Sequence, residues 1–202
     1  GLTINANRGI ALGAGGGTIT LTTNQATNVN GIIAGVGGLT LSNTGTSTLA
    51  IGGVNTYTGG TTISGTGTIV AGNVASPFGV GGILTLNGGQ LRSNVTADRT
   101  LANPVNIAAD TTFPNVASEK SLTFTGPAVL SGTRTLTVGV GASVAGKAVT
   151  FSNGISESVA GSGLTKVGNG ELVLGGLNTF TGPTSVTAGR LTYTKKIGRV
   201  HV

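Results

Sequence analysis

One twelve-residue segment occurs twice in this chain, and this duplication restricts the fold more than any other feature of the sequence. Residues 52–63 read GGVNTYTGGTTI and residues 175–186 read GGLNTFTGPTSV, so the two segments align without a gap. Seven of the twelve positions are identical, and only Gly60 opposite Pro183 is not a conservative difference. A segment that recurs at this length predicts a chain built from repeated structural units.

The duplication extends beyond this segment in both directions. Upstream, NGIIAGVGGLTL at 30–41 is matched by NGISESVAGSGLTKV at 153–167, and downstream SGTGTIV is matched by TAGRLTY. Two blocks, about 28–71 and 151–194, are therefore copies of one unit. We expect a single domain over 1–202, with a basic terminal tail or cap at 195–202.

Short alternating segments fill both blocks and the region between them. LTL, TLAI, TTI and TIV in the first block, and ILTL, SLTF and TLTV further along, alternate apolar residues with Thr or Ser. This period of two is typical of half-buried β-strands, and Asn-Gly pairs between the segments favour tight turns. No window has helical periodicity, so the sequence predicts an all-β chain.

Composition favours stacked coils of short strands over a conventional sandwich. The chain has 38 glycines, 38% hydrophobic residues and 8% charged residues, the last well below the roughly 25% of ordinary soluble domains. The apolar residues are mostly Val, Ile and Leu, which suit a narrow, repetitive core. We expect a right-handed parallel β-solenoid of roughly nine rungs, each of about 22 residues, which forms a rod roughly 40–45 Å long. A β-sandwich or barrel is the structural alternative.

The second block resembles a known family repeat. The string GLTKVGNGELVLGGLNTFTGPTSVTAGRL at 163–191 is similar to the autotransporter-associated β-strand repeat, and NTYTGGTTI in the first block fits the same pattern. The first block departs from it at LSNTGTST, and the segments at 6–19 and 83–91 resemble sequences that flank such repeats. The resemblance implies a β-helical passenger of a large exported surface protein of a Gram-negative-type bacterium, often an adhesin. It implies no single activity.

The repeated turn supplies the candidate site residues, which we interpret as a structural corner. We expect its asparagines to bond their own backbone or stack on neighbouring rungs, its aromatic rings to cap the bend, and the glycines Gly59 and Gly182 to adopt unusual φ angles. A ligand-binding loop presented twice is the alternative. The residues are Asn55, Tyr57 and Gly59 in the first copy, and Asn178, Phe180 and Gly182 in the second.

The sequence gives little support for catalysis or for a cofactor. The chain has no cysteine, and His201 is its one histidine, so no thiolate metal site and no histidine dyad is available. A polysaccharide-cleaving β-helix needs clustered carboxylates, and only Asp98 and Asp110, with Arg99 beside them, are candidates for adjacent coils. We expect no enzyme activity, no metal and no cofactor. The acidic residues are Asp98, Asp110, Glu119, Glu157 and Glu171.

The net charge of +6 raises the question of an anionic partner. The basic residues are scattered except near the end of the chain, and aromatic residues make up only 3%, too few for a base-stacking platform. We therefore expect no specific nucleic acid partner, and no apolar run is long enough to span a membrane. The candidate docking tail consists of Lys195, Lys196 and Arg199.

Three functions from different classes remain. The first is a stiff stalk or adhesin-type segment that is secreted or held at the cell surface, with a cell-surface or matrix ligand. The second is a self-assembling filament subunit joined head-to-tail, since the ends of a solenoid are unpaired edges. The third is an ice- or carbohydrate-binding face, which we rank last because its threonine pairs are irregularly spaced. These pairs are Thr18 and Thr20, Thr66 and Thr68, Thr123 and Thr125, and Thr135 and Thr137.

Overall fold

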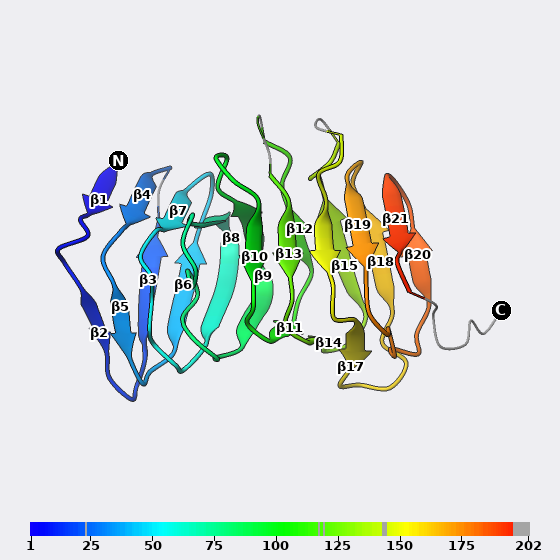
Figure 1. Cartoon of the computed structure of the whole chain (residues 1–202), viewed down its shortest axis with the longest axis horizontal. Coiled ribbons are helices and arrows are strands. Elements are labelled where there is room, and N and C mark those ends of the chain that lie inside the picture. Colours follow the sequence, from blue (N-terminus) through cyan, green and yellow to red (C-terminus); the bar gives the residue numbers. More distant parts are fainter. Residues whose placement is uncertain (23, 117, 119, 143–144, 196–202) are drawn as a thin grey trace.

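Parallel strands wind into coils that stack along one axis (Figure 1). The computed structural model describes residues 1–22, 24–116, 118, 120–142 and 145–195. Within these ranges the chain forms 21 strands and no helix. The architecture is a β-solenoid of about eight turns, which confirms the predicted fold and agrees with the roughly nine rungs expected.

Strands of successive coils stack in parallel, and each such stack is called a column here. The described strands form three columns, and the chain passes through the first, the second and the third in turn in each complete coil. The first column consists of β3 (Gly17–Leu21), β6 (Leu39–Asn43), the first parts of β8 (Thr61–Ala71) and β9 (Leu84–Ser93), β11 (Val105–Ile107), β14 (Ala128–Leu130) and β17 (Ile155–Glu157). The second consists of β1 (Leu2–Ile4), β4 (Ala26–Val29), β7 (Thr48–Ile51), the remaining parts of β8 and β9, β12 (Thr111–Phe113), β15 (Arg134–Val138), β18 (Leu164–Val167) and β20 (Thr184–Val186).

The third column is interrupted. It begins with β2 (Ile10–Leu12) and β5 (Ile33–Gly35), and it resumes with β10 (Arg99–Leu101), β13 (Leu122–Phe124), β16 (Val149–Phe151), β19 (Glu171–Leu174) and β21 (Arg190–Tyr193). In the coils between β5 and β10, where the third column has no strand, isolated backbone hydrogen bonds join one coil to the next. Thr56 N donates to Ile33 O at 2.9 Å, and Val80 N donates to Tyr57 O at 3.0 Å.

Coil length varies along the rod, as the register partners show. Thr61 pairs with Leu84 in the first half of the chain. A shorter coil separates Glu171 from its partner Arg190, and a longer one separates Arg134 from its partner Leu164. The connections between β12 and β13 and between β15 and β16 account for part of the extra length of the longer coils.

Alternation of inward and outward residues builds the core, as the period of two predicts. In β6, for example, Leu39 and Leu41 are buried while Thr40 between them is half-buried. The expectation of an aliphatic core is incomplete, because four phenylalanines lie fully inside. Phe124 and Phe151 are register partners on successive coils, and their rings stack with centroids 4.7 Å apart, a geometry that adds to the gain from burial.

The core is closed along the rod and open at its ends. In the part of the chain that the structure describes, seven hydrophobic residues pack against the core but are only partly buried, and all of them lie in the first or the last coil. They are Ile4, Ile10, Ile19, Leu21, Phe180, Leu191 and Tyr193. Each lacks a neighbouring coil on one side among the described residues, and β1 and β21 lie at opposite ends of the rod (Figure 1).

Candidate functional site

Asn55 in the first copy of the repeated corner links three successive coils. Its side chain is fully buried. The Oδ1 atom accepts a hydrogen bond from Ile33 N at 2.8 Å, and Nδ2 donates to Pro77 O at 2.7 Å. Asn55 therefore takes part in the ladder between coils with its side chain, where the third column has no regular strand.

Tyr57 lies fully inside the same corner. Its hydroxyl is 2.5 Å from Thr61 Oγ1, and Thr61 Oγ1 donates in turn to Phe78 O at 3.2 Å. Burial raises the pKa of Tyr57 to about 12, although the hydrogen bond with Thr61 opposes this shift. The phenol therefore stays neutral and anchors the bend from within.

The second copy reproduces this arrangement in part. Asn178 Oδ1 accepts from Ile155 N at 2.9 Å, which matches the Asn55 contact, but Nδ2 reaches only Gly175 O at 3.4 Å. Phe180 is partly buried against the core and has no hydroxyl to donate. The second corner belongs to the last coil that the structure describes, and within that part of the chain the Asn178 side chain bonds only the preceding coil and its own.

The prediction that Gly59 and Gly182 supply unusual φ angles is wrong. Neither has a positive φ, which in the first copy occurs at Gly60 with φ 85°. The two glycines are needed for close approach instead. A Cβ on Gly59 would lie 2.3 Å from Gly37 C, and one on Gly182 would lie 2.3 Å from Gly161 O.

Pro183 replaces Gly60 in the second copy without loss of the ladder contact. Gly60 O accepts from Leu39 N at 2.9 Å, and Pro183 O accepts from Leu164 N at 2.9 Å as well. The ring of proline removes the N–H donor and holds φ negative, but this contact needs only a carbonyl. The substitution therefore keeps the bond between coils while it excludes the positive φ.

The two copies do not lie on the same columns. Leu39–Leu41 of the first copy is in β6 of the first column, whereas the equivalent 164–166 is in β18 of the second column. In the same way Thr48–Ile51 lies in the second column and Glu171–Leu174 lies in the third. The second copy is displaced by one column, so the two repeated corners lie on different edges of the rod.

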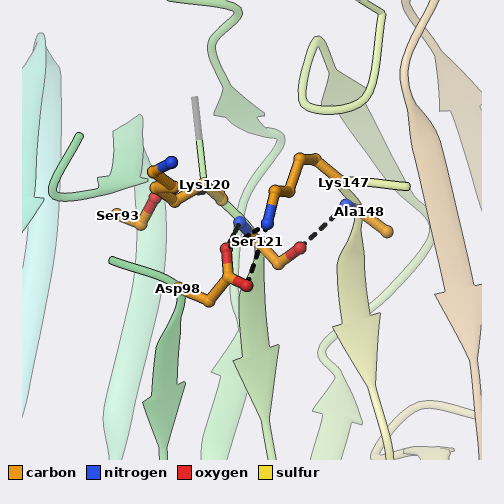
Figure 2. A network of polar contacts seen from close by, with 6 residues as sticks. All are labelled: Ser93, Asp98, Lys120, Ser121, Lys147 and Ala148. Carbon is orange, nitrogen blue, oxygen red and sulfur yellow. Dashed lines mark hydrogen bonds and ion pairs between the residues drawn. The ribbon is translucent and has the colours of Figure 1, made fainter. Parts of the chain in front are cut away.

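Asp98 is the centre of a polar network that spans three coils (Figure 2). Its Oδ1 accepts from Ser121 N at 2.8 Å, and its carboxylate pairs with Lys147 Nζ at 3.0 Å. Burial favours the neutral acid, but the hydrogen bonds from Lys147 and Ser121 outweigh it and hold the pKa of Asp98 below its usual value. Ser121 Oγ accepts from Ala148 N at 3.3 Å and extends the network.

The other described carboxylates also bind the following coil. Asp110 Oδ1 accepts from Thr135 N at 2.8 Å, and Glu171 accepts from Arg190 at 2.5 Å. Glu157 accepts from both the hydroxyl and the N–H of Thr181, and these bonds lower its pKa. Each side chain thus has a structural partner, and Glu119 lies outside the described residues.

The catalytic candidates are not brought together. Asp98 precedes β10 and Asp110 precedes β12, so the two lie at different corners, and Arg99 donates to Asn73 Oδ1. In the ranges that the structure describes, no three His, Cys, Asp or Glu side chains are grouped closely enough to hold a metal ion. No helix in those ranges is long and apolar enough to cross a membrane.

A buried lysine is the feature that the sequence did not reveal. Lys166 is an inward residue of β18, and its side chain is fully buried. The ammonium donates to three backbone carbonyls, those of Val167 at 3.2 Å, Gly168 at 2.5 Å and Ala188 at 2.9 Å. Burial lowers its pKa. The lysine ties the last coil to the one before it.

The remaining candidates are either exposed or dispersed. Lys195 is exposed after β21, and the other two residues of the predicted docking tail, Lys196 and Arg199, lie outside the described residues. The four threonine pairs do not share a face, because Thr18 lies in the first column, Thr68 and Thr135 in the second, and Thr123 in the third. They form no single array.

Comparison with known protein families identifies two repeats in the chain. The passenger-associated-transport-repeat family matches residues 39–71 and 164–192. These ranges lie within the two copies found in the sequence, and they confirm the resemblance to an autotransporter passenger repeat. No curated protein and no solved structure matches the chain.

Proposed function

Because the chain carries two passenger-associated transport repeats, we propose that it is a non-catalytic segment of an autotransporter passenger that forms a stiff stalk outside the cell. The observation that carries this proposal is the occurrence of these repeats in one continuous parallel solenoid. We place the segment at the surface of a Gram-negative-type bacterium. There it would hold an adhesive region of the protein away from the membrane, where that region can reach a cell-surface or matrix ligand.

The contacts between coils support a mechanical role. Asp98, Asp110, Glu157 and Glu171 all bind residues of a later coil. The core is continuous, so bending the rod requires that packed residues separate. Eight stacked coils at about 4.8 Å each make a rod roughly 40 Å long.

Surface location is tested on intact cells of the organism that makes the protein. Antibodies raised against the purified chain are expected to label unpermeabilised cells, and external proteinase K is expected to remove that label. A cytoplasmic protein serves as the control for cell integrity. Labelling only after permeabilisation would refute the proposal.

A head-to-tail filament is the second candidate, and the open ends of the core favour it. The partly buried residues of the first and last coils are apolar surfaces that a second copy would cover, and their strands have unpaired edges. The charges oppose it, since Arg8 lies in the first coil and Lys195 follows the last strand, whereas Arg190 is already paired with Glu171. We therefore rank the stalk first.

Electron microscopy of the purified chain over a concentration series separates the two candidates. The stalk predicts single short rods at every concentration. Uniform fibres that lengthen with concentration and show a repeat of one rod length would establish the filament. Arg8→Glu is the informative variant, because an acidic first coil is expected to promote stacking on a basic last coil if the ends meet.

A further inference from the structure

A row of threonines runs along the first column in the first half of the rod. Thr18 pairs with Thr40, Thr40 with Thr62, and Thr62 with Thr85, so the four residues lie in register on successive coils. They point outward, since the residues beside Thr40 and Thr62 face the core. The sequence did not reveal this row, because the four threonines are aligned only by the register in which their strands pair.

This threonine row lines an open groove of about 700 Å³ that crosses the four coils. Glycines of the preceding corner, among them Gly16, Gly38 and Gly60, form its other side. A wall without side chains allows a ligand to approach the backbone closely. The groove runs along the rod axis, so a ligand that fills it must be extended in that direction.

The hydroxyls of the row are available to a ligand. Among the described residues, Thr18, Thr40, Thr62 and Thr85 make no side-chain hydrogen bond to the protein. In the adjacent outward row, by contrast, Ser64 Oγ donates to Leu41 O at 3.5 Å. Each free hydroxyl supplies one donor and two acceptor positions, repeated about every 4.8 Å along the groove.

The surroundings of the groove carry no charge. Residues 9–91 contain no Asp, Glu, Lys, Arg or His, and Arg8 is the one charged side chain before Arg92. Such a surface offers nothing to pair with a phosphate, a carboxylate or a sulfate, and it presents hydroxyls, methyl groups and backbone amides instead. This chemistry matches a neutral ligand that is itself rich in hydroxyls.

We propose that this groove binds an extended neutral polysaccharide, with the sugar chain parallel to the rod axis and roughly one sugar unit opposite each coil. The inference rests on the proposed extracellular role and adds the class of ligand. Ice is a poorer fit, since a crystal face needs a flat and regular array of matched rows. The adjacent row reads Thr20, Ser42, Ser64 and Asn87, and the surface is hollowed.

The test is affinity electrophoresis of the purified chain in gels that contain hydroxyethylcellulose, galactomannan or arabinoxylan, with alginate as the anionic comparison. At least one neutral polymer is expected to retard the chain. Alginate is attracted by the net charge of +6, so any retardation by alginate is expected to be the same in the chain and in its threonine variants. The double variant Thr40→Val and Thr62→Val removes two hydroxyls at little change of shape and is expected to weaken retardation at least ten-fold. Short oligosaccharides of that polymer are expected to compete better as they lengthen from two to about four units.

The matched control is the double variant Thr123→Val and Thr150→Val, an in-register outward pair in the third column of the charged half. It is expected to bind as the original chain does, and thermal unfolding checks that both variants fold. Absence of retardation by all three neutral polymers would overturn the inference, as would equal loss in both double variants. Thermal hysteresis without glycan binding would assign the row to ice instead. Because these measurements use purified chain, their failure leaves the surface-labelling result untouched.

Discussion

Replacement of Asn55 by alanine is the most direct test of how the coils are held together. The side chain is buried and completes the ladder where no regular strand does so. Its removal leaves Ile33 N–H and Pro77 C=O without the partners they have at 2.8 and 2.7 Å. Both residues are buried, so water cannot replace these bonds without local opening.

The expected cost follows from the two orphaned groups. Each buried polar group that loses its partner costs about 1–3 kcal/mol, so Asn55→Ala, which orphans two such groups, is expected to reduce the free energy of unfolding by about 2–6 kcal/mol. Asn178→Ala is the matched comparison. It removes one good contact, to Ile155 N at 2.9 Å, and one long contact at 3.4 Å, so we expect a loss of about 1–2 kcal/mol.

Urea unfolding followed by circular dichroism measures the stabilities, and hydrogen exchange measures the local effect. Exchange is needed because long repeat arrays do not always unfold in a single step. The amide of Ile33 is expected to lose protection in Asn55→Ala. The exposed neighbour Thr56→Ala is the control. If Asn55→Ala and Thr56→Ala differ by less than about 0.5 kcal/mol, within the usual range for surface changes, the bridging argument is refuted.

Three further predictions concern packing and charge. Gly59→Ala places a Cβ 2.3 Å from Gly37 C and is expected to destabilise the chain by about 3 kcal/mol through overpacking, as measured by urea unfolding. Tyr57, with its pKa raised to about 12, is expected to resist ionisation in an ultraviolet titration, and stability is expected to fall above about pH 10, where the unfolded phenol ionises. Asp98→Asn is expected to remove stability that the original chain has at neutral pH and loses in acid, because a lowered carboxyl pKa stabilises only above the unfolded value of 3.8.

Each of these predictions has a control. Gly15→Ala meets no atom within 4 Å, and an equal loss in both glycine variants would contradict the steric argument. Ionisation of Tyr57 near pH 10 in the folded chain would contradict its burial. The pair of Asp98 with Lys147 is partly exposed, so Asp98→Asn is expected to cost about 0–1 kcal/mol at neutral pH. If the Asp98→Asn variant and the original chain differed more in stability at pH 3 than at pH 7, the sign would be contradicted.

The local features of the fold were predictable because they depend on short stretches of chain. Alternation of apolar and hydroxyl residues specifies strands such as β6 and β13, whose inward and outward residues follow the predicted period. The NTYTGG and NTFTGP corners were recognisable as turns for the same reason. The two asparagines were expected to bond their own backbone or to stack on neighbouring coils, and the structure shows that their side chains accept hydrogen bonds from the preceding coil.

The role of individual corner residues was less predictable. Gly59 was expected to adopt an unusual φ, but its φ is not positive. A glycine is needed there because Gly37 of the previous coil leaves no room for a side chain. Lys166 follows the same alternating pattern as an apolar residue, and only the packing shows that three carbonyls accept its ammonium inside the core. Gly37 lies on another coil than Gly59, and one of the three carbonyls around Lys166, that of Ala188, also comes from another coil. The local sequence does not identify either contact.

The sequence by itself determined that this chain repeats, that it forms short strands, and that these strands suit a parallel solenoid. Only the tertiary structure decided which strands stack. The column in which a segment lies depends on the summed length of all the coils before it. The coils between Leu39 and Leu164 do not amount to a whole number of turns, so the second copy lies one column further on. The pairing of the strands brings Thr18, Thr40, Thr62 and Thr85 into one row. The facing of apolar residues toward the core and the length of each turn set this register. The residues that it pairs lie a whole coil apart in the sequence, beyond the reach of any local pattern.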